Sequence, residues 1–259
     1  MLGAVIGDIV GSVYEFSNHR SKTFNPFFHE KAFFTDDTVC TMAVADALMH
    51  DRNPAEALKD WGRRYWDNGG WGQRFALWLA GDEMASYGSY GNGAAMRVAP
   101  VGLLAGSVAE VTALSRRVTA VTHDHPEGLK GAEATALAIF LARNRITPSH
   151  IKVAVTERFG YDLTRTVDEI RPNYRFNETC QETVPEALVC ALNAADFEDA
   201  IRNAISIGGD SDTVAAIAGG VAEALFGIPD EIADQAWARL PYEMREVLTD
   251  LYRKVGALV

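Results

Sequence analysis

The chain has 259 residues, 48% of them hydrophobic, which is enough to bury a substantial core in one large domain. Its net charge of −11 argues against nonspecific binding to nucleic acid or to an anionic membrane. It has no uncharged run of about 18 residues, so we expect no membrane span. The start lacks the basic segment of a signal peptide, and the number and spacing of the three cysteines fit a reducing compartment. These features favour a cytoplasmic protein.

Helices are expected along most of the chain, because apolar residues recur at helical spacing and Pro or Asn marks several starts. Their expected ranges are 2–12, 37–50, 54–67, 73–80, 94–104, 108–121, 126–144, 148–159, 181–193, 196–206, 212–226, 230–238 and 242–255. The run 15–34 predicts a long ordered loop, and 160–178 predicts an irregular segment. If the helix near 181 starts at Val184, Pro185 lies in its opening turn. No strand-like alternation occurs, so we predict an all-α, single-domain protein over residues 1–259.

Three glycines near the start are spaced four residues apart. Gly3, Gly7 and Gly11 therefore share one face of the first expected helix. Because glycine has no Cβ, this face allows another backbone to approach closely.

Two acidic stretches of similar form open helices that are almost entirely apolar, and such helices are typically buried. The stretches are Thr35-Asp36-Asp37-Thr38 and Gly209-Asp210-Ser211-Asp212-Thr213. Small residues in the two helices allow close packing, which would bring the acidic ends together. Four neighbouring carboxylates repel one another and need cations, and carboxylate and hydroxyl oxygens suit Mg²⁺, Mn²⁺ or Ca²⁺. The alternative is a pair of ordinary Asp-rich helix caps.

Other candidate groups are less specific. The Gly-rich run 88–93 precedes an expected helix and could present backbone N–H groups to a phosphate, or form an ordinary turn. The segment His123-Asp124-His125 could bind a metal or cap the helix that follows. Glu15 has no partner evident from the sequence, and a lone glutamate is usually solvated.

Taken in order, five motifs resemble those of the ADP-ribosylglycohydrolases, over residues 3–227. They are Gly7-Asp8-x-x-Gly11, Thr35-Asp36-Asp37-Thr38, the run Gly88-Ser89-Tyr90-Gly91-Asn92-Gly93-Ala94-Ala95-Met96-Arg97, Thr122-His123 and Gly209-Asp210-Ser211-Asp212-Thr213. The resemblance implies a compact, single-domain orthogonal helical bundle with two Mg²⁺ or Mn²⁺ ions at the base of a cleft. The implied metal ligands are Thr35, Asp36, Asp37, Asp210, Asp212 and Thr213. Asp8 and Ser211 would support these ligands indirectly.

The resemblance also implies roles around the substrate. Ser89, Tyr90, Gly91 and Asn92 would hold the diphosphate and distal ribose, with His123 beside them. The implied catalytic residues are Glu15, Asp36, Asp37 and Asp212. In some family members, a loop glutamate matching Glu15 moves between open and closed forms of the cleft.

The implied reaction is metal-dependent hydrolysis of the glycosidic bond between ADP-ribose and an acceptor, most simply a protein side chain such as arginine. An ADP-ribosyl small molecule is a further substrate, and nucleic acid is expected only as a modified substrate. We expect a monomer without a membrane partner. The alternative function is a non-catalytic ADP-ribose-binding or structural, crystallin-like protein on the same fold. A different Mg²⁺-dependent phosphohydrolase would need a nucleophile or a lysine near the phosphates, which the Gly-rich run does not contain.

Overall fold

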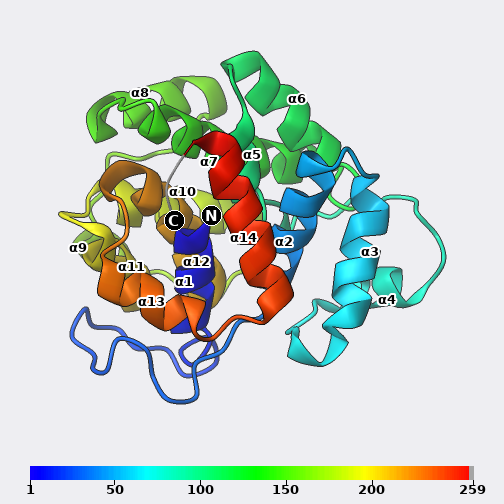
Figure 1. The fold of residues 1–259 in the computed structure, drawn as a ribbon. Coiled ribbons are helices and arrows are strands. Elements are labelled where there is room, and N and C mark those ends of the chain that lie inside the picture. Colours follow the sequence, from blue (N-terminus) through cyan, green and yellow to red (C-terminus); the bar gives the residue numbers. More distant parts are fainter. Residues whose placement is uncertain (257–259) are drawn as a thin grey trace.

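The computed structural model describes residues 1–256, and its regular elements are helices (Figure 1). The α-helices of this part are α1 (Leu2–Gly11), α2 (Asp36–Met49), α3 (Pro54–Arg64), α4 (Gln73–Ala80), α5 (Ala99–Leu104), α6 (Val108–Thr119), α7 (Pro126–Arg143), α8 (Pro148–Phe159), α9 (Val167–Ile170), α10 (Cys180–Leu192), α11 (Phe197–Ile207), α12 (Ser211–Phe226), α13 (Asp230–Trp237) and α14 (Tyr242–Val255). Two 3₁₀ turns are η1 (Trp66–Asn68) and η2 (Asn92–Ala94). Between residues 1 and 256 there is no strand beyond one isolated bridge, Gly91 to Thr179, so the all-α prediction is confirmed. In the same range, no helix combines the length and the hydropathy that a membrane crossing needs.

The pair α1 and α12 lies at the centre of the molecule (Figure 1). The helices that pack against one or both of them are α2, α5, α7, α10, α11 and α13. A Cβ added at Gly7 would lie 2.0 Å from the carbonyl oxygen of Ala215, and one at Gly3 would lie 2.3 Å from that of Gly219. The two backbones are therefore in direct contact, and only glycine fits at these positions of α1. The glycine face predicted from the spacing of these residues is confirmed.

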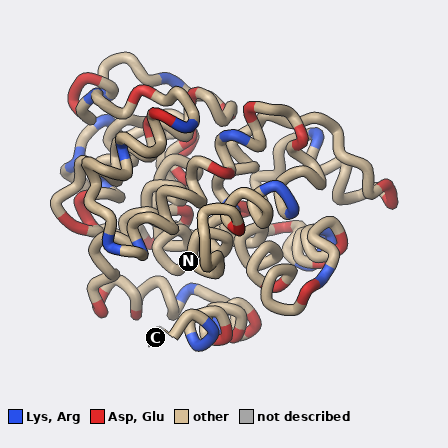
Figure 2. The backbone as a smooth tube through the Cα atoms, turned by 90° about the horizontal axis from the view of Figure 1, so that it is seen from above, with Lys and Arg blue, Asp and Glu red and all other residues tan. Residues whose placement is uncertain are grey.

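The start of α1 is also buried. The Met1 amino group donates a hydrogen bond to Glu223 Oε2 at 2.5 Å, and the Gly3 N–H donates to the same oxygen at 2.7 Å. The Leu2 N–H donates to Tyr252 Oη at 2.8 Å. These bonds satisfy N–H groups that have no acceptor within the helix. Elsewhere, acidic and basic residues are interspersed over the outer helices (Figure 2).

One expected helix and the position of one proline differ from the structure. The expected helix 94–104 is replaced by η2 and the shorter α5, because Pro100 has no N–H with which to continue a helix from Met96. Helix α10 spans Cys180–Leu192, within one residue of the expected 181–193, so Pro185 lies inside the helix and not in its opening turn. The segment 160–178 is mostly irregular, as expected, but it contains the short helix α9. Thr166 and Glu169 form a capping box at the N-terminus of this helix.

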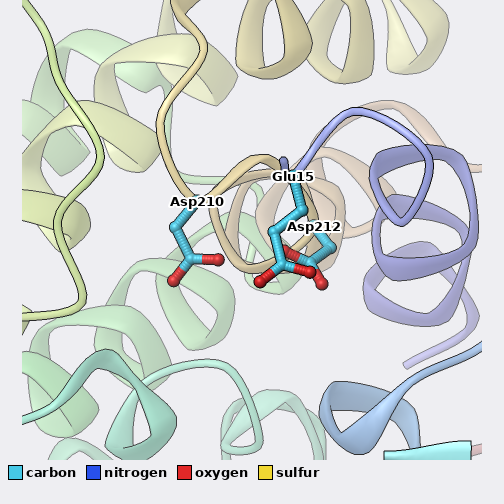
Figure 3. A group of neighbouring side chains, drawn as sticks. All are labelled: Glu15, Asp210 and Asp212. Atoms are coloured by element: carbon cyan, nitrogen blue, oxygen red, sulfur yellow. The ribbon is translucent and has the colours of Figure 1, made fainter. Parts of the chain in front are cut away.

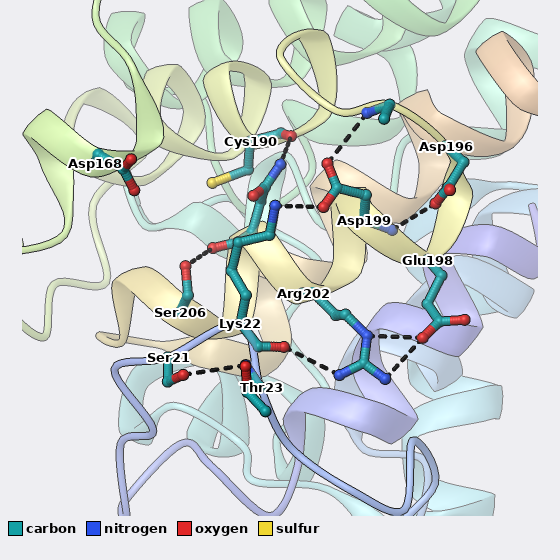
Figure 4. Close-up of polar contacts among 12 residues, drawn as sticks. Ser21, Lys22, Thr23, Asp168, Cys190, Asp196, Glu198, Asp199, Arg202 and Ser206 are labelled. Atoms are coloured by element: carbon teal, nitrogen blue, oxygen red, sulfur yellow. Dashed lines mark hydrogen bonds and ion pairs between the residues drawn. The ribbon is translucent and has the colours of Figure 1, made fainter.

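The long loop between α1 and α2 is fastened to α11 (Figure 4). Arg202 donates hydrogen bonds to the carbonyl oxygens of Lys22 and Phe24, at 3.0 and 2.9 Å. Lys22 forms an ion pair with Asp199, and Glu198 accepts a hydrogen bond from Arg202 Nε at 2.7 Å. This segment carries Glu15 near its start, so its anchoring helps to position that carboxyl group.

Candidate active site

Helix α1 links the two acidic motifs through Asp8, which is fully buried. The Asp8 carboxylate accepts hydrogen bonds from the backbone N–H and the hydroxyl of Thr35, at 2.9 and 2.7 Å, and from those of Thr38, at 3.1 and 2.5 Å. A residue of one helix thus caps the N-terminus of another, which satisfies two of the unpaired N–H groups of α2. Burial raises the pKa of Asp8 to about 6, against the lowering effect of these four bonds.

The N-terminal ends of α2 and α12 meet, as the paired motifs predict. The Thr213 hydroxyl donates to Asp37 Oδ2 at 3.2 Å. The arrangement differs from the expected direct packing of these two helices, because α12 packs chiefly along α1. A Cβ at Gly11 would lie 2.3 Å from the Cα of Asp212, so the last glycine of α1 contacts the acidic motif itself. Helix α1 therefore holds both halves of the site.

Three carboxyl groups gather at this junction, contributed by Glu15, Asp210 and Asp212 (Figure 3). One carboxylate oxygen from each lies within 4.8 Å of the others. Asn92 donates to Asp210 Oδ2 at 2.6 Å, which fixes the orientation of that side chain. Glu15 thus has close partners that the sequence did not reveal, and it is the least buried member of the group.

The loop around Glu15 is hydrogen-bonded to residues just before α12 and to the segment 160–178. Asn18 donates to the carbonyl oxygen of Gly209 at 2.9 Å and accepts from the N–H of the same residue at 2.9 Å. Arg20 donates to the carbonyl oxygens of Ile207 and Tyr174, at 2.9 and 2.8 Å. These bonds attach the loop directly to the residues that precede Asp210.

Crowding of the acids changes their pKa values. Burial, together with Asp210 and Asp36, raises the pKa of Glu15 to about 7. Burial and the charge of Asp8 raise the pKa of Asp36 to about 7. Burial and the neighbouring carboxylates hold the pKa values of Asp37 and Asp212 well above the usual range. Without a cation, the cluster is therefore partly protonated near neutral pH.

The donor set fits a hard divalent cation. Asp37 Oδ1 is buried and has no hydrogen-bond partner within residues 1–256. Burying this oxygen costs free energy unless a cation or a water molecule binds to it. The nearby donors are carboxylate and hydroxyl oxygens, the ligands that Mg²⁺ and Mn²⁺ prefer. Of the expected ligands, Asp36, Asp37, Asp210, Asp212 and Thr213 line one cleft. Thr35 does not line it, and its hydroxyl group is hydrogen-bonded to Asp8.

The cleft has a volume of about 390 Å³ and extends from the acids to the Gly-rich segment. Ser89, Tyr90, Gly91, Asn92 and His123 all line it, so the two sets of expected site residues share one cavity. The volume lies within the usual range for small-molecule sites.

The Gly-rich segment differs from the expected anion cradle. It leads into the 3₁₀ turn η2 and not into the N-terminus of a long helix. The N–H groups of Ser89 and Asn92 donate to the carbonyl oxygens of Thr122 and Glu178, at 3.2 and 2.7 Å, and that of Gly91 donates to Ser89 Oγ at 3.2 Å. Three N–H groups are thus already used within the protein, and side chains must supply more of the binding than the sequence suggested.

His123 and His125 have separate roles. His125 caps α7, because its Nδ1 accepts from the Glu127 N–H at 3.2 Å, so the capping interpretation holds for this residue. His123 is 5% exposed and lines the cleft. Burial and the charges of Arg97 and Arg74 hold its pKa well below the usual range, so the imidazole is neutral at pH 7.

Several cleft residues were absent from the sequence-based site. They are Gly70, Gly72, Gln73, Arg74, Phe75, Tyr87, Gly93, Met96, Arg97, Glu178 and Thr179. Arg97 belongs to one of the quoted motifs, yet nothing in local periodicity indicates that it is only 1% exposed. Glu178 ends the irregular segment 160–178 and Thr179 follows it, and sequence patterns do not predict where these residues lie in the fold.

Known proteins similar to this chain match it over nearly its whole length. The model of the family described as ADP-ribosylglycohydrolase matches residues 1–258. ADP-ribosylhydrolase ARH3 of Mus musculus is 27% identical over 98% of this chain and 90% of its own length. ADP-ribosylarginine hydrolase Tri1 of Pseudomonas putida (strain GB-1) is 26% identical over 100% of this chain and 79% of its own.

A solved structure titled "ADP-ribosylglycohydrolase-related protein complex" superposes with a TM-score of 0.74 at 26% identity, covering 98% of this chain and 95% of that one. The family match, the relatives and the shared fold agree with the order of the five motifs. These similarities also agree with the presence of an acidic cluster and a Gly-rich segment in the same cleft. The chain therefore belongs to the ADP-ribosylglycohydrolase family, which confirms the family and the enzyme class expected from its motifs.

Proposed function

We propose that this protein hydrolyses the glycosidic bond between ADP-ribose and the side chain of a modified protein, with arginine as the first acceptor to test. The observation that carries the proposal is the cleft itself, where carboxylates from three distant chain segments face a neutral histidine and two arginines. A relative that is named an ADP-ribosylarginine hydrolase supports the choice of acceptor. ADP-ribosyl small molecules are further substrates of the same chemistry.

We propose that Asp36, Asp37, Asp210, Asp212 and Thr213 hold two divalent cations, Mg²⁺ or Mn²⁺, with Thr35 as a further ligand. The orphaned Oδ1 of Asp37 and the raised pKa values of the cluster support this assignment. When bound, the cations supply positive charge and Lewis acidity at the acidic end of the cleft. The Asp8 carboxylate, through its bonds to Thr35 and Thr38, holds the start of α2 in place for them.

We assign proton transfer to Glu15. It is the most accessible carboxyl group of the cluster, it sits on a loop, and its pKa of about 7 suits exchange of a proton near neutral pH. The aspartates around it, ionised when cations are bound, stabilise the positive charge that develops on the ribose in an oxocarbenium-like transition state. At the other end, the segment Ser89–Asn92 and His123 bind the diphosphate and orient the sugar.

The test is release of ADP-ribose from ADP-ribosylated arginine, serine and nucleic acid, measured with Mg²⁺ or Mn²⁺ and again with EDTA. We expect release from at least the arginine conjugate, and its loss on chelation. Binding of ADP-ribose without release from any conjugate would overturn the enzymatic proposal and favour the binding or structural role on this fold.

The variant Asp212→Asn should lose turnover and cation binding while keeping its fold. Asp234→Asn is the matched control, because Asp234 is an exposed residue of α13, outside the cleft. Wild-type turnover in Asp212→Asn would contradict the proposed cation site. Sedimentation velocity of the same samples tests the expected monomer.

A further inference from the structure

Arg97 is a buried cation without an acidic partner among the described residues. Its side chain is 1% exposed, and its Nε has no hydrogen-bond partner in this part of the chain. Its Nη2 donates to the hydroxyl oxygen of Thr122 at 2.7 Å and lies 3.5 Å from Nδ1 of His123. Burying an unpaired charge is costly, so a group at this position calls for a role beyond packing.

The Thr122 hydroxyl connects Arg97 to His123. A guanidinium group only donates hydrogen bonds, so Thr122 Oγ1 must accept from Arg97. The Thr122 hydroxyl also lies 2.8 Å from His123 Nδ1, so it can donate its own proton to this nitrogen. An N–H on Nδ1 would also point its proton toward the guanidinium. An acceptor at Nδ1 satisfies both contacts, whereas an N–H there would face the N–H groups of Arg97.

The other ring nitrogen of His123 faces the cleft. Cβ atoms added at Gly93 and Gly91 would lie 3.3 and 3.7 Å from Nε2. Within residues 1–256, the hydrogen bonds of this ring all involve Nδ1. A neutral imidazole carries one proton, so an acceptor at Nδ1 places that proton on Nε2.

We propose that Arg97 and Thr122 are positioning residues that fix the Nε2–H tautomer of His123, so that this ring donates a hydrogen bond to a phosphate oxygen of the ADP-ribose diphosphate. The proposal rests on the proposed function for the identity of the ligand. It also gives the buried charge of Arg97 a role, because this charge both orders Thr122 and opposes protonation of the ring. A neutral donor recognises an anion without adding a second positive charge to a buried site.

The first experiment reads the tautomer in the ligand-free protein. Long-range ¹⁵N–¹H correlation spectra distinguish protonated from unprotonated ring nitrogens, and the chain has only 6 histidines. The His123 signals are assigned by their loss in His123→Gln. At pH 7.5 we expect an unprotonated Nδ1 and a protonated Nε2. An Nδ1–H tautomer or a doubly protonated ring would overturn the proposal.

The second experiment removes the connecting hydroxyl. Thr122→Val keeps the side-chain shape and removes one of the two groups that hold the Nε2–H tautomer. The fraction of the Nδ1–H tautomer should rise, and the Kd for ADP-ribose should increase about 3- to 10-fold, the equivalent of one ordinary hydrogen bond. The effect should appear in KM and leave kcat nearly unchanged. The matched control Thr122→Ser retains the hydroxyl and should restore both the tautomer and the affinity.

Each outcome decides a separate claim. An unchanged tautomer in Thr122→Val would remove the positioning role of Thr122, and a changed tautomer with an unchanged Kd would remove the role in ligand binding. Circular dichroism confirms that the variants are folded. A wild-type protein that binds no ADP-ribose would count against the proposed function, whereas the spectra of the ligand-free protein would still decide the tautomer.

Discussion

Asp36 begins α2 within the carboxylate cluster, and its replacement by asparagine tests the charge balance of the site. Burial and the charge of Asp8 raise its pKa from an ordinary 3.8 to about 7. The folded, cation-free protein thus holds the Asp36 proton more tightly than the unfolded chain does. Its stability is therefore highest below the unfolded pKa and falls as the pH rises toward 7. Asp36→Asn should lack this fall.

The size of the effect follows from the same pKa. A rise from 3.8 to about 7 corresponds to about 4 kcal/mol of lost stability at pH 8. Partial exposure of Asp36 and sharing of the repulsion with neighbouring acids reduce this figure to about 2 kcal/mol. In EDTA, Asp36→Asn should therefore melt about 4–8 °C above the wild type at pH 8, and near the wild-type Tm at pH 4.5.

Thermal unfolding with EDTA and with excess MnCl₂, at both pH values, provides the assay. Mn²⁺ should raise the wild-type Tm at pH 8 and leave that of Asp36→Asn unchanged, since only a ligand that binds the folded state stabilises it. A cation-free variant that is less stable than the wild type at pH 8, or that gains as much from Mn²⁺, would refute the reasoning.

Asp46 in the same helix is the matched control. Although burial opposes its ionisation, a hydrogen bond from Trp61 Nε1 at 3.0 Å and contacts with His50 and Arg52 lower its pKa. Its contribution to stability is present above the unfolded pKa and is lost as the pH falls. Asp46→Asn should therefore be less stable than the wild type at pH 8 and should retain the full response to Mn²⁺.

Three further predictions concern packing, proton transfer and cation binding. Gly7→Ala should lower the free energy of unfolding by about 3 kcal/mol in urea titrations, because its Cβ would clash with the Ala215 carbonyl group. The control Gly72→Ala, whose Cβ would have no atom within 4 Å, should change the free energy of unfolding by less than about 0.5 kcal/mol. Glu15→Gln should lower kcat at least about 100-fold in ADP-ribose release while ADP-ribose still binds, and retained turnover would reassign proton transfer. Calorimetry should show that the affinity for Mn²⁺ falls from pH 8 to pH 6 and that binding releases protons, because protons occupy carboxyl groups whose pKa lies near 7. A pH-independent affinity would contradict this prediction.

Local sequence signals were enough to predict most of the helices. Asn53-Pro54 marks the start of α3, where the Asn53 side chain accepts from the Ala55 N–H, and the predicted bounds of α4, α8 and α14 match the structure. The glycine spacing of α1 predicted a face of close backbone approach, and the two acidic openings predicted a shared site. The helix bounds and the glycine face depend on residues within a few turns of one another, which is the range over which periodicity and capping act.

Other features depend on how distant segments pack. Only the tertiary structure brings Glu15 to Asp210 and Asp212, buries Arg97 without an acid, and directs the N–H groups of the Gly-rich segment back into the protein.

The acidic motifs by themselves predicted a cation site, with ordinary helix caps as the alternative, because four neighbouring carboxylates repel one another unless cations are present. The tertiary structure decided how the two motifs come together. They lie about 175 residues apart, and α1 joins them, with its glycines against α12 and Asp8 against the start of α2. That contact depends on the close fit of two backbones, which no pattern within either motif encodes.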